Sequence, residues 1–166
     1  MAVRPVLVFP DPRLKTPASF CQDVSLEVID VAQDLFDTMA SHQGCVGLAA
    51  PQIGVSLRII IVDVTGHPKA ARSSGPLIVV DPILVAMDGS ELGREGCPSL
   101  PHITANVLRA ERIFLSGKSL EGRQIKAECS GFEARVIQHE IDHLDGILIL
   151  DRVASPSEIF ERAKKR

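Results

Sequence analysis

The sequence lacks several features that mark common classes of protein. Tryptophan and tyrosine are absent, so any binding surface must rely on aliphatic side chains and the six phenylalanines. No apolar run approaches the roughly 20 residues that span a bilayer, and residues 1–5 do not open a secretory signal peptide. We therefore expect a cytoplasmic protein that makes no contact with a membrane.

Positive charge is also scarce. The chain has 18 Lys and Arg against 21 Asp and Glu, for a net charge of −3, and the only basic run is residues 164–166. Nucleic-acid-binding domains usually carry clustered Lys and Arg on one face. The sequence therefore predicts no direct binding to nucleic acid.

The cysteines lack the spacing of a structural zinc site. The four are Cys21, Cys45, Cys97 and Cys129, and no two of them form a C-x-x-C pair, which excludes a four-cysteine zinc knuckle. In a reducing cytoplasm they are not expected to form disulfides. A buried thiol is the ordinary expectation for any one of them.

Length and patterning predict one α+β domain over residues 1–166. Ser25 can cap a helix to Ser41, and Ser130 can open a helix of about 14 residues that ends at Gly146. A third, short C-terminal helix is predicted from the capping pattern at residues 155–158.

Short apolar runs separated by Gly and Pro predict antiparallel strands rather than βαβ crossovers. They lie within residues 57–64, 77–87, 91–95, 105–116 and 123–129. The Asp81-Pro82 pair is expected to break the second run, and Asp88-Gly89 is a hairpin-type turn signal. Antiparallel sheets are expected to surround the helix that follows Ser130.

That helix carries the pattern H-E-x-x-H, in which His139 and His143 are four residues apart. Positions i and i+4 share one helix face, so both imidazoles can bind one metal ion. Glu140 lies beside them, where a general base for a water nucleophile is needed. A chance surface pair of histidines is the alternative interpretation.

A catalytic metal site needs a third protein ligand and an open position. No third histidine follows at the spacing of the long zinc-protease motifs, and His42, His67 and His102 are expected at the surface. Cys97 lies between Gly96 and Pro98, outside any regular element, and is the best candidate. A Cys/His/His set is compatible with zinc or iron(II).

Three motifs together resemble the signatures of the peptide deformylases. They are Gly-Leu-Ala-Ala-Pro-Gln at residues 47–52, Glu-Gly-Cys-x-Ser at residues 95–99 and Gln-His-Glu-x-Asp-His-Leu at residues 138–144. They occur in the order and at about the spacing of that family, and the resemblance extends over nearly the whole chain.

The resemblance implies that Cys97, His139 and His143 bind one divalent metal, iron(II) in the cell and zinc or nickel in some preparations. It implies that Glu140 is the general acid and base, and that Gln52 donates to the formyl oxygen. It also implies a substrate site at Val46, Gly47, Leu48, Glu95, Gly96, Phe132 and Val136, in which Val46, Phe132 and Val136 line the methionine pocket. A pairing of Glu95 with Arg109 is expected as well, and Gln138 or Asp142 could support the ligands, with a solvated Asp142 as the alternative.

The implied reaction removes formate from the N-formyl-methionine of nascent polypeptides. The protein is expected to act as a monomer and to meet these polypeptides at the ribosome. Three positions depart from the family pattern: Cys45 replaces a glycine, Thr104 replaces an arginine, and Pro98 replaces a leucine. The leucine's backbone N–H points at the formyl oxygen, and proline has no N–H. We therefore predict a slow deformylase. The alternatives are a related amide hydrolase with another substrate, or a metal- or peptide-binding protein without catalysis.

Overall fold

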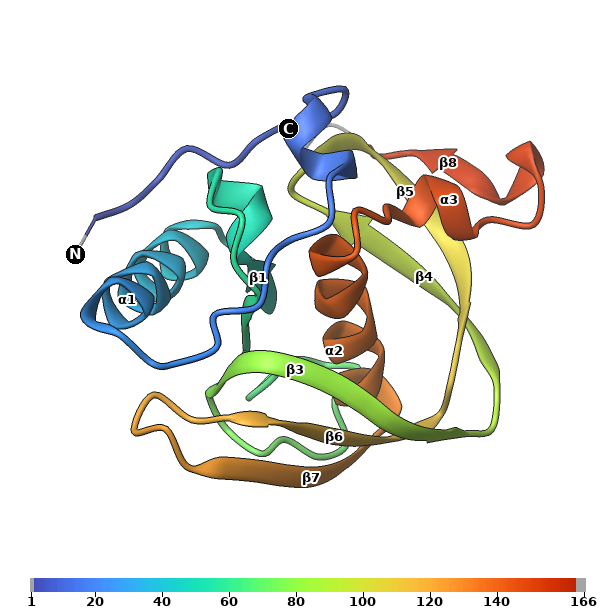
Figure 1. The fold of residues 1–166 in the computed structure, drawn as a ribbon. Helices are drawn as coiled ribbons and strands as arrows, with labels where there is room; N and C mark the ends of the chain where they lie inside the picture. The colour runs from blue at the N-terminus through green and yellow to red at the C-terminus, as the bar shows by residue number, and fades with distance from the viewer. Residues whose placement is uncertain (1, 164–166) are drawn as a thin grey trace.

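The computed structural model describes residues 2–163, so the basic run at 164–166 lies outside the described residues. The chain forms helices and two antiparallel sheets (Figure 1), which confirms the predicted α+β class. The five-stranded sheet has the strand order β1-β2-β3-β6-β7, and the three-stranded sheet has the order β4-β5-β8. No helix within residues 2–163 has the length and hydropathy of a bilayer-spanning segment.

The helices are α1 (Leu26–Ser41), α2 (Gly131–Leu144) and α3 (Ile149–Arg152), and 3₁₀ turns occupy Pro12–Lys15, Ala50–Ile53 and Pro156–Glu158. The five-stranded sheet contains β1 (Gly47–Ala49), β2 (Ile59–Val62), β3 (Leu77–Asp88), β6 (Arg112–Lys118) and β7 (Gln124–Ser130). The three-stranded sheet contains β4 (Glu91–Cys97), β5 (Leu100–Arg109) and β8 (Ile159–Glu161).

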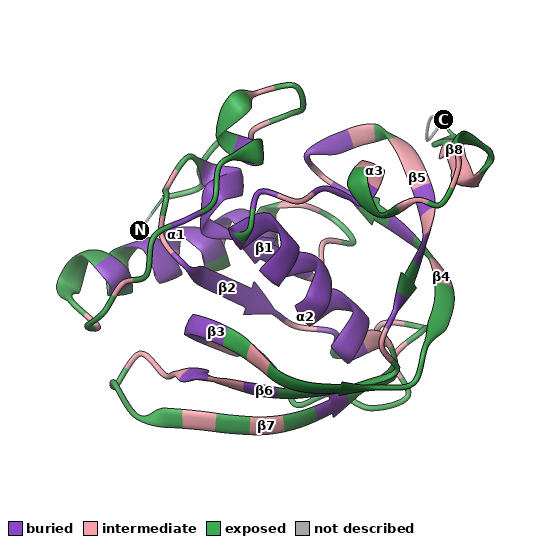
Figure 2. Cartoon of the chain, turned by 45° about the vertical axis from the view of Figure 1, so that its right-hand side comes forward, coloured by how far each residue is buried: buried purple, intermediate pink, exposed green. Residues whose placement is uncertain are grey.

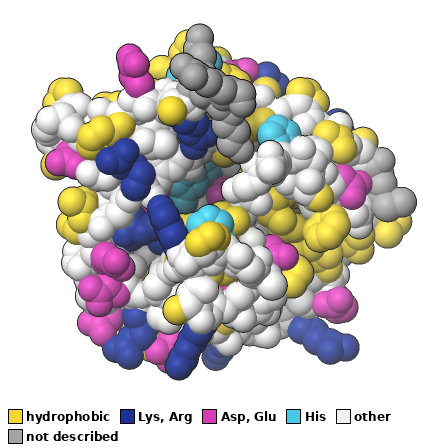
Figure 3. Space-filling view, turned by 180° about the vertical axis from the view of Figure 1, so that it is seen from behind, with side chains coloured by type: hydrophobic (Ala, Val, Ile, Leu, Met, Phe, Trp, Pro, Cys, Tyr) yellow, Lys and Arg dark blue, Asp and Glu magenta, His cyan; other side chains and the backbone are white. Residues whose placement is uncertain are grey.

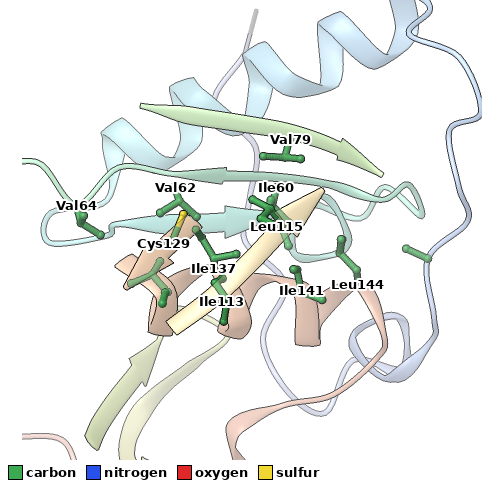
Figure 4. Packing of buried hydrophobic residues seen from close by; sticks show 14 residues of the cluster. Ile60, Val62, Val64, Val79, Ile113, Leu115, Cys129, Ile137, Ile141 and Leu144 are labelled. Carbon is green, nitrogen blue, oxygen red and sulfur yellow. The ribbon is translucent and has the colours of Figure 1, made fainter. Parts of the chain in front are cut away.

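Helix α2 is the centre of the molecule and has the predicted length of 14 residues. Every residue from Glu133 to Leu144 is buried, and Figure 2 shows this helix between the two sheets. Its apolar face packs against the five-stranded sheet (Figure 4); the cluster includes Ile60, Val62, Val79, Ile113, Leu115, Ile137, Ile141 and Leu144. The polar face of a fully buried helix must therefore find its partners inside the protein.

Helix α1 is also as predicted, with Ser25 Oγ accepting a hydrogen bond from the Val28 N–H. Its apolar stripe packs on β1 and β2, in a second cluster that includes Val28, Ala32, Leu35, Ile59 and Ile61. This helix is scaffold for the strands that approach α2.

Two predicted turns have a different role in the structure. Asp81 has φ 52°, and a β-bulge between Val80 and Ile83 lets β3 continue through Asp81-Pro82, so the predicted break is wrong. The turn at Gly89 does not join paired strands, because Asp88 pairs with Arg112 of β6 while Glu91 pairs with Arg109 of β5. The chain changes sheets at this corner instead of forming a hairpin.

The C-terminal helix predicted from Ser155 is also corrected. The Ser155 side chain makes no capping hydrogen bond, and only the single 3₁₀ turn Pro156–Glu158 forms. The chain then becomes strand β8, in which Ile159 and Phe160 pair with Ala105 and Thr104 of β5. Pairing of a β-branched and an aromatic residue with an exposed sheet edge outweighs the local capping signal.

Candidate active site

Cys97 is the last residue of β4, so the expectation that it lies outside any regular element is wrong. His139 and His143 lie on one face of α2. One ligand atom from each of the three residues lies within 4.8 Å of the others, and Cys97 Sγ is 3.3 Å from His143 Nε2. Ligands at ~2.0–2.3 Å from a tetrahedral metal are ~3.5 Å apart, so this spacing suits one ion. All three residues are buried. Burial lowers the pKa of His143 well below its ordinary value, which favours the neutral imidazole that a metal requires.

The Nδ1 nitrogen of His139 is bound by the buried carboxylate of Glu95. His139 Nδ1 is 2.8 Å from Glu95 Oε2, and Glu95 also accepts hydrogen bonds from Arg109 at 2.8 and 3.0 Å and from Arg135 at 3.0 Å. Burial by itself would raise the pKa of Glu95, but the bonds from Arg109 and His139 hold it well below its ordinary value. A carboxylate in this position fixes the ring and leaves Nε2 for the metal.

The ionic cluster continues along α2. Arg109 donates to Asp142 Oδ2, and Arg152 donates to both Asp142 oxygens at 3.0 and 2.7 Å. Asp142 is therefore a buried ion-pair partner and not a solvated carboxylate. Gln138 instead bonds the backbone of Ala110, at the corner between the sheets.

Glu140 is buried beside the cluster but is not part of the ion pairs. Its Oε2 has no hydrogen-bond partner among residues 2–163, and burial raises its pKa to about 7. A Cβ on Gly47 would lie 2.6 Å from Glu140 Oε1, so only glycine lets β1 approach the carboxylate this closely. An orphaned buried carboxylate beside three metal-type donors suits a proton carrier for a bound water.

Gln52 lies on the 3₁₀ turn after β1 and is 1 % exposed. Its Oε1 accepts from the Ala49 N–H at 2.9 Å, while Nε2 donates to Ser99 Oγ at 3.1 Å and lies 3.6 Å from Cys97 Sγ. These contacts orient the amide with one N–H toward the ligand cysteine. Ser99, whose role the sequence did not indicate, is the residue that fixes this orientation.

Pro98 and Ser99 form the two-residue turn between β4 and β5. Proline suits the first central position of such a turn because its φ is already near the required value. The N-terminal segment braces the same region: Leu7 N–H donates to Gln52 O at 2.7 Å, and Phe9 N–H donates to Ser99 O at 2.9 Å. Nothing in the sequence of residues 1–24 indicates this contact.

A cavity of about 590 Å³ opens onto the cluster, and Figure 3 shows histidine in its depth. Its lining includes Cys97, His139 and Glu140 and six predicted substrate residues: Val46, Gly47, Glu95, Gly96, Phe132 and Val136. The seventh, Leu48, is 1 % exposed and packs in the α1 cluster instead, because its side chain points to the opposite face of β1. Gln52 and His143 lie behind the cavity wall.

The cavity has side chains that the sequence placed at the surface. His42 and His67 line it, and His67 stacks on Phe132 with ring centroids 4.4 Å apart, whereas His102 is exposed. Cys45 also lines it; its Sγ donates to Gly47 O at 3.1 Å, and burial raises the pKa of the thiol to about 12. This cysteine is therefore a neutral wall residue.

Comparison with known proteins gives one consistent result. Residues 3–158 match the family described as polypeptide deformylase. The chain is 44% identical over 150 residues to peptide deformylase from Dictyoglomus thermophilum, covering 90% of this chain and 92% of the relative. It is 41% identical to that of Thermomicrobium roseum, covering 96% and 90%. The crystal structure of peptide deformylase from Thermotoga maritima superposes with a TM-score of 0.84 at 34% identity, covering 93% of this chain and all of the other.

Proposed function

This chain belongs to the polypeptide deformylase family, and we propose on that basis how its residues carry out the reaction. The reaction is hydrolysis of the formyl amide of nascent polypeptides, and we assign formyl-methionine as the first residue of its substrate. The observation that carries the assignment of roles is the buried Cys97, His139 and His143 cluster with Glu140 beside it, whose Oε2 has no hydrogen-bond partner in the described part of the chain.

Cys97, His139 and His143 would hold one divalent ion. A bound ion would supply Lewis acidity that makes a water nucleophilic near neutral pH. One thiolate and two imidazoles suit iron(II), zinc and nickel. We propose iron(II) as the ion used in the cell, with zinc or nickel entering in preparations.

Glu140 would take a proton from the attacking water and deliver it to the nitrogen of the leaving methionyl amine. Its position against Gly47 supports this role, because an extended peptide along β1 would pass the carboxylate. The Gln52 N–H directed toward Cys97 would donate to the formyl oxygen as that oxygen gains negative charge. Val46, Phe132 and Val136 would contact the methionine side chain, since all three line the cavity.

Pro98 would lower the rate. It follows the ligand Cys97 in the turn, and it offers no N–H to the formyl oxygen, so Gln52 would act without a backbone partner. Loss of one such donor costs on the order of 10²–10³ in kcat. We therefore expect Pro98→Leu to raise kcat by about 10-fold or more, with the metal content unchanged. Equal kcat for wild type and Pro98→Leu would refute this role for Pro98.

The decisive experiment measures formate released from formyl-Met-Ala-Ser by protein loaded anaerobically with iron(II). Acetyl-Met-Ala-Ser is the matched control, because it differs by one methyl group at the reacting carbon. Formate from the formyl peptide at a rate far above that of a Glu140→Gln variant is expected. A rate no higher than that of the variant would overturn the assignment of Glu140 and favour metal or peptide binding without catalysis.

We also propose that residues 1–166 act as one domain and as a monomer. Nascent chains are its substrates, so the place of action would be the cytoplasm, at the ribosome. The net charge of −3 supports contact with the emerging peptide rather than with ribosomal RNA.

A further inference from the structure

Three exposed cations surround the mouth of the cavity: Lys69, Arg94 and Arg162. Figure 3 shows Lys and Arg side chains gathered at this hollow. They come from three separate parts of the chain, namely the loop before β3, strand β4 and the residues after β8. A net negative protein therefore presents a local positive field to whatever enters its active site.

Arg94 is held in one orientation. Its guanidinium carbon lies 3.5 Å from the Phe160 ring centroid, Nε donates to Asn106 Oδ1 at 2.8 Å, and Nη1 donates to Thr104 Oγ1 at 3.2 Å. These partners are all uncharged, so they position the guanidinium without neutralising it. The remaining N–H groups can bind a carboxylate at a small entropic cost.

Arg162 also lies against β4, at the end of the strand that carries Gly96. Its backbone N–H donates to His102 O at 2.8 Å, which extends the β5–β8 pairing. A Cβ on Gly96 would lie 1.8 Å from Arg162 Nη2, so the guanidinium rests directly on the residue before the ligand Cys97. Strand β8, which follows the residues whose capping pattern predicted a helix, brings this arginine to the site.

No carboxylate within residues 2–163 forms an ion pair with Arg94 or Arg162. Glu95 is taken up by Arg109, Arg135 and His139, and Glu158 accepts from Asn106 instead. The two guanidiniums thus line one cavity and have no partner of opposite charge among residues 2–163.

We propose that Arg94 and Arg162 form a carboxylate-binding subsite for the substrate. It selects formyl-methionyl peptides with Asp or Glu at the second or third residue. This inference rests on the proposed function, which places methionine between Val46, Phe132 and Val136. Gly96, Arg94 and Arg162 line the same cavity. Because successive residues of an extended peptide advance by about 3.5 Å, we place the side chains that follow methionine beside the two guanidiniums.

The test compares amidated tetrapeptides of formyl-Met-Xaa-Ala-Ala and formyl-Met-Ala-Xaa-Ala, with Xaa as Ala, Glu or Lys. Amidated C-termini ensure that a side chain is the only substrate carboxylate, and a free-acid arm measures any contribution of the terminus. At low ionic strength we expect Glu to exceed Lys by about three- to ten-fold in kcat/KM at one of the positions. Most of the difference should be in KM and should decline above about 0.3 M salt, because the subsite is exposed.

The variants Arg94→Gln and Arg162→Gln, alone and together, are expected to reduce the Glu-to-Lys ratio, to about one in the double variant. Arg94→Lys keeps the charge and should retain part of the ratio, which separates charge recognition from loss of β4–β5 packing. Arg123→Gln is the matched control, since it removes one exposed charge in the turn between β6 and β7, away from the cavity. It should leave the ratio unchanged.

Equal kcat/KM for the Glu and Lys peptides in the wild type would overturn the subsite, and so would a ratio that persists in the double variant. A preference found only in the free-acid arm would assign the arginines to the peptide terminus and also refute the side-chain proposal. Failure of the proposed function is distinguishable, because the all-alanine formyl peptide would then release no formate at all.

Discussion

The metal cluster has two sides that are built differently. On the ionic side, Glu95 holds His139 and is itself held by Arg109 and Arg135. On the neutral side, the Gln52 amide donates to Cys97 Sγ and to Ser99 Oγ through uncharged hydrogen bonds, and Pro98 contributes no donor. Even the two histidines differ, because His143 Nδ1 has no hydrogen-bond partner among residues 2–163.

The difference separates two tasks. Buried charge-assisted bonds are strong and directional, so the ionic side fixes the geometry of the ligands. A weakly engaged amide can exchange its thiol contact for a substrate oxygen, so the neutral side can act on the reaction itself. Changes on the ionic side should therefore reduce metal retention, and changes on the neutral side should reduce rate while the metal stays bound.

The largest effect is expected at Glu140, which belongs to neither side. Glu140→Gln keeps the shape of the side chain and removes the proposed proton carrier, and should lower kcat by about 10²–10⁴. Metal content by elemental analysis should match that of the wild type, because no hydrogen bond within residues 2–163 links Glu140 to Cys97, His139 or His143. Retention of more than about a tenth of wild-type kcat would mean that another group moves the proton.

The next effect tests the neutral side. Gln52→Leu should lower kcat by about 10²–10³, because it removes the proposed donor to the developing oxyanion. Ser99→Ala is the control, since it removes only the bond that orients the amide and should cost less than about 10-fold. If Gln52→Leu lost metal in proportion to rate, the residue would be a support for Cys97 and the separation of the two sides would be wrong.

Glu95→Gln tests the ionic side. It leaves Arg109 and Arg135 without their shared carboxylate and should weaken metal affinity by about 10- to 100-fold. Breaking a buried ion pair from one partner also lowers the free energy of unfolding by roughly 3–5 kcal/mol. Competition with a chelator and thermal unfolding measure the two effects. Saturating metal should restore most of kcat, and a rate that stays low at full occupancy would count against a purely supporting role.

The sequence predicted much of this site because its signals are local. The spacing of His139 and His143 on one helix face, with Glu140 beside them, depends only on a few neighbouring positions. Pairing of Glu95 with Arg109 was expected from the family pattern, and the structure confirms the contact.

What escaped the sequence depends on contacts between distant segments. Nothing near Arg135 or Arg152 indicates that they meet Glu95 and Asp142. Likewise, nothing near Glu133 indicates that it accepts hydrogen bonds from Ser74 of a distant loop. Strand β8 was mistaken for helix because its partner β5 lies about 55 residues earlier. The resemblance included Leu48 in the substrate site, but its side chain packs in the α1 cluster, because side chains alternate along a strand.

The smallest effect is expected at the outer end of the ionic side, where Arg152 is 44% exposed and bonds Asp142. Arg152→Gln removes one partner, but Arg109 still pairs with that carboxylate from the buried side. An exposed pair contributes about 0–1 kcal/mol, so the free energy of unfolding should fall by about 1 kcal/mol or less, and metal affinity should not change. Urea unfolding and the same chelator competition used for Glu95→Gln give the comparison. If Arg152→Gln lost as much metal as Glu95→Gln, the ion pairs from Glu95 to Arg152 would act together on metal affinity. Support of the metal site would then not be confined to the contact between Glu95 and His139.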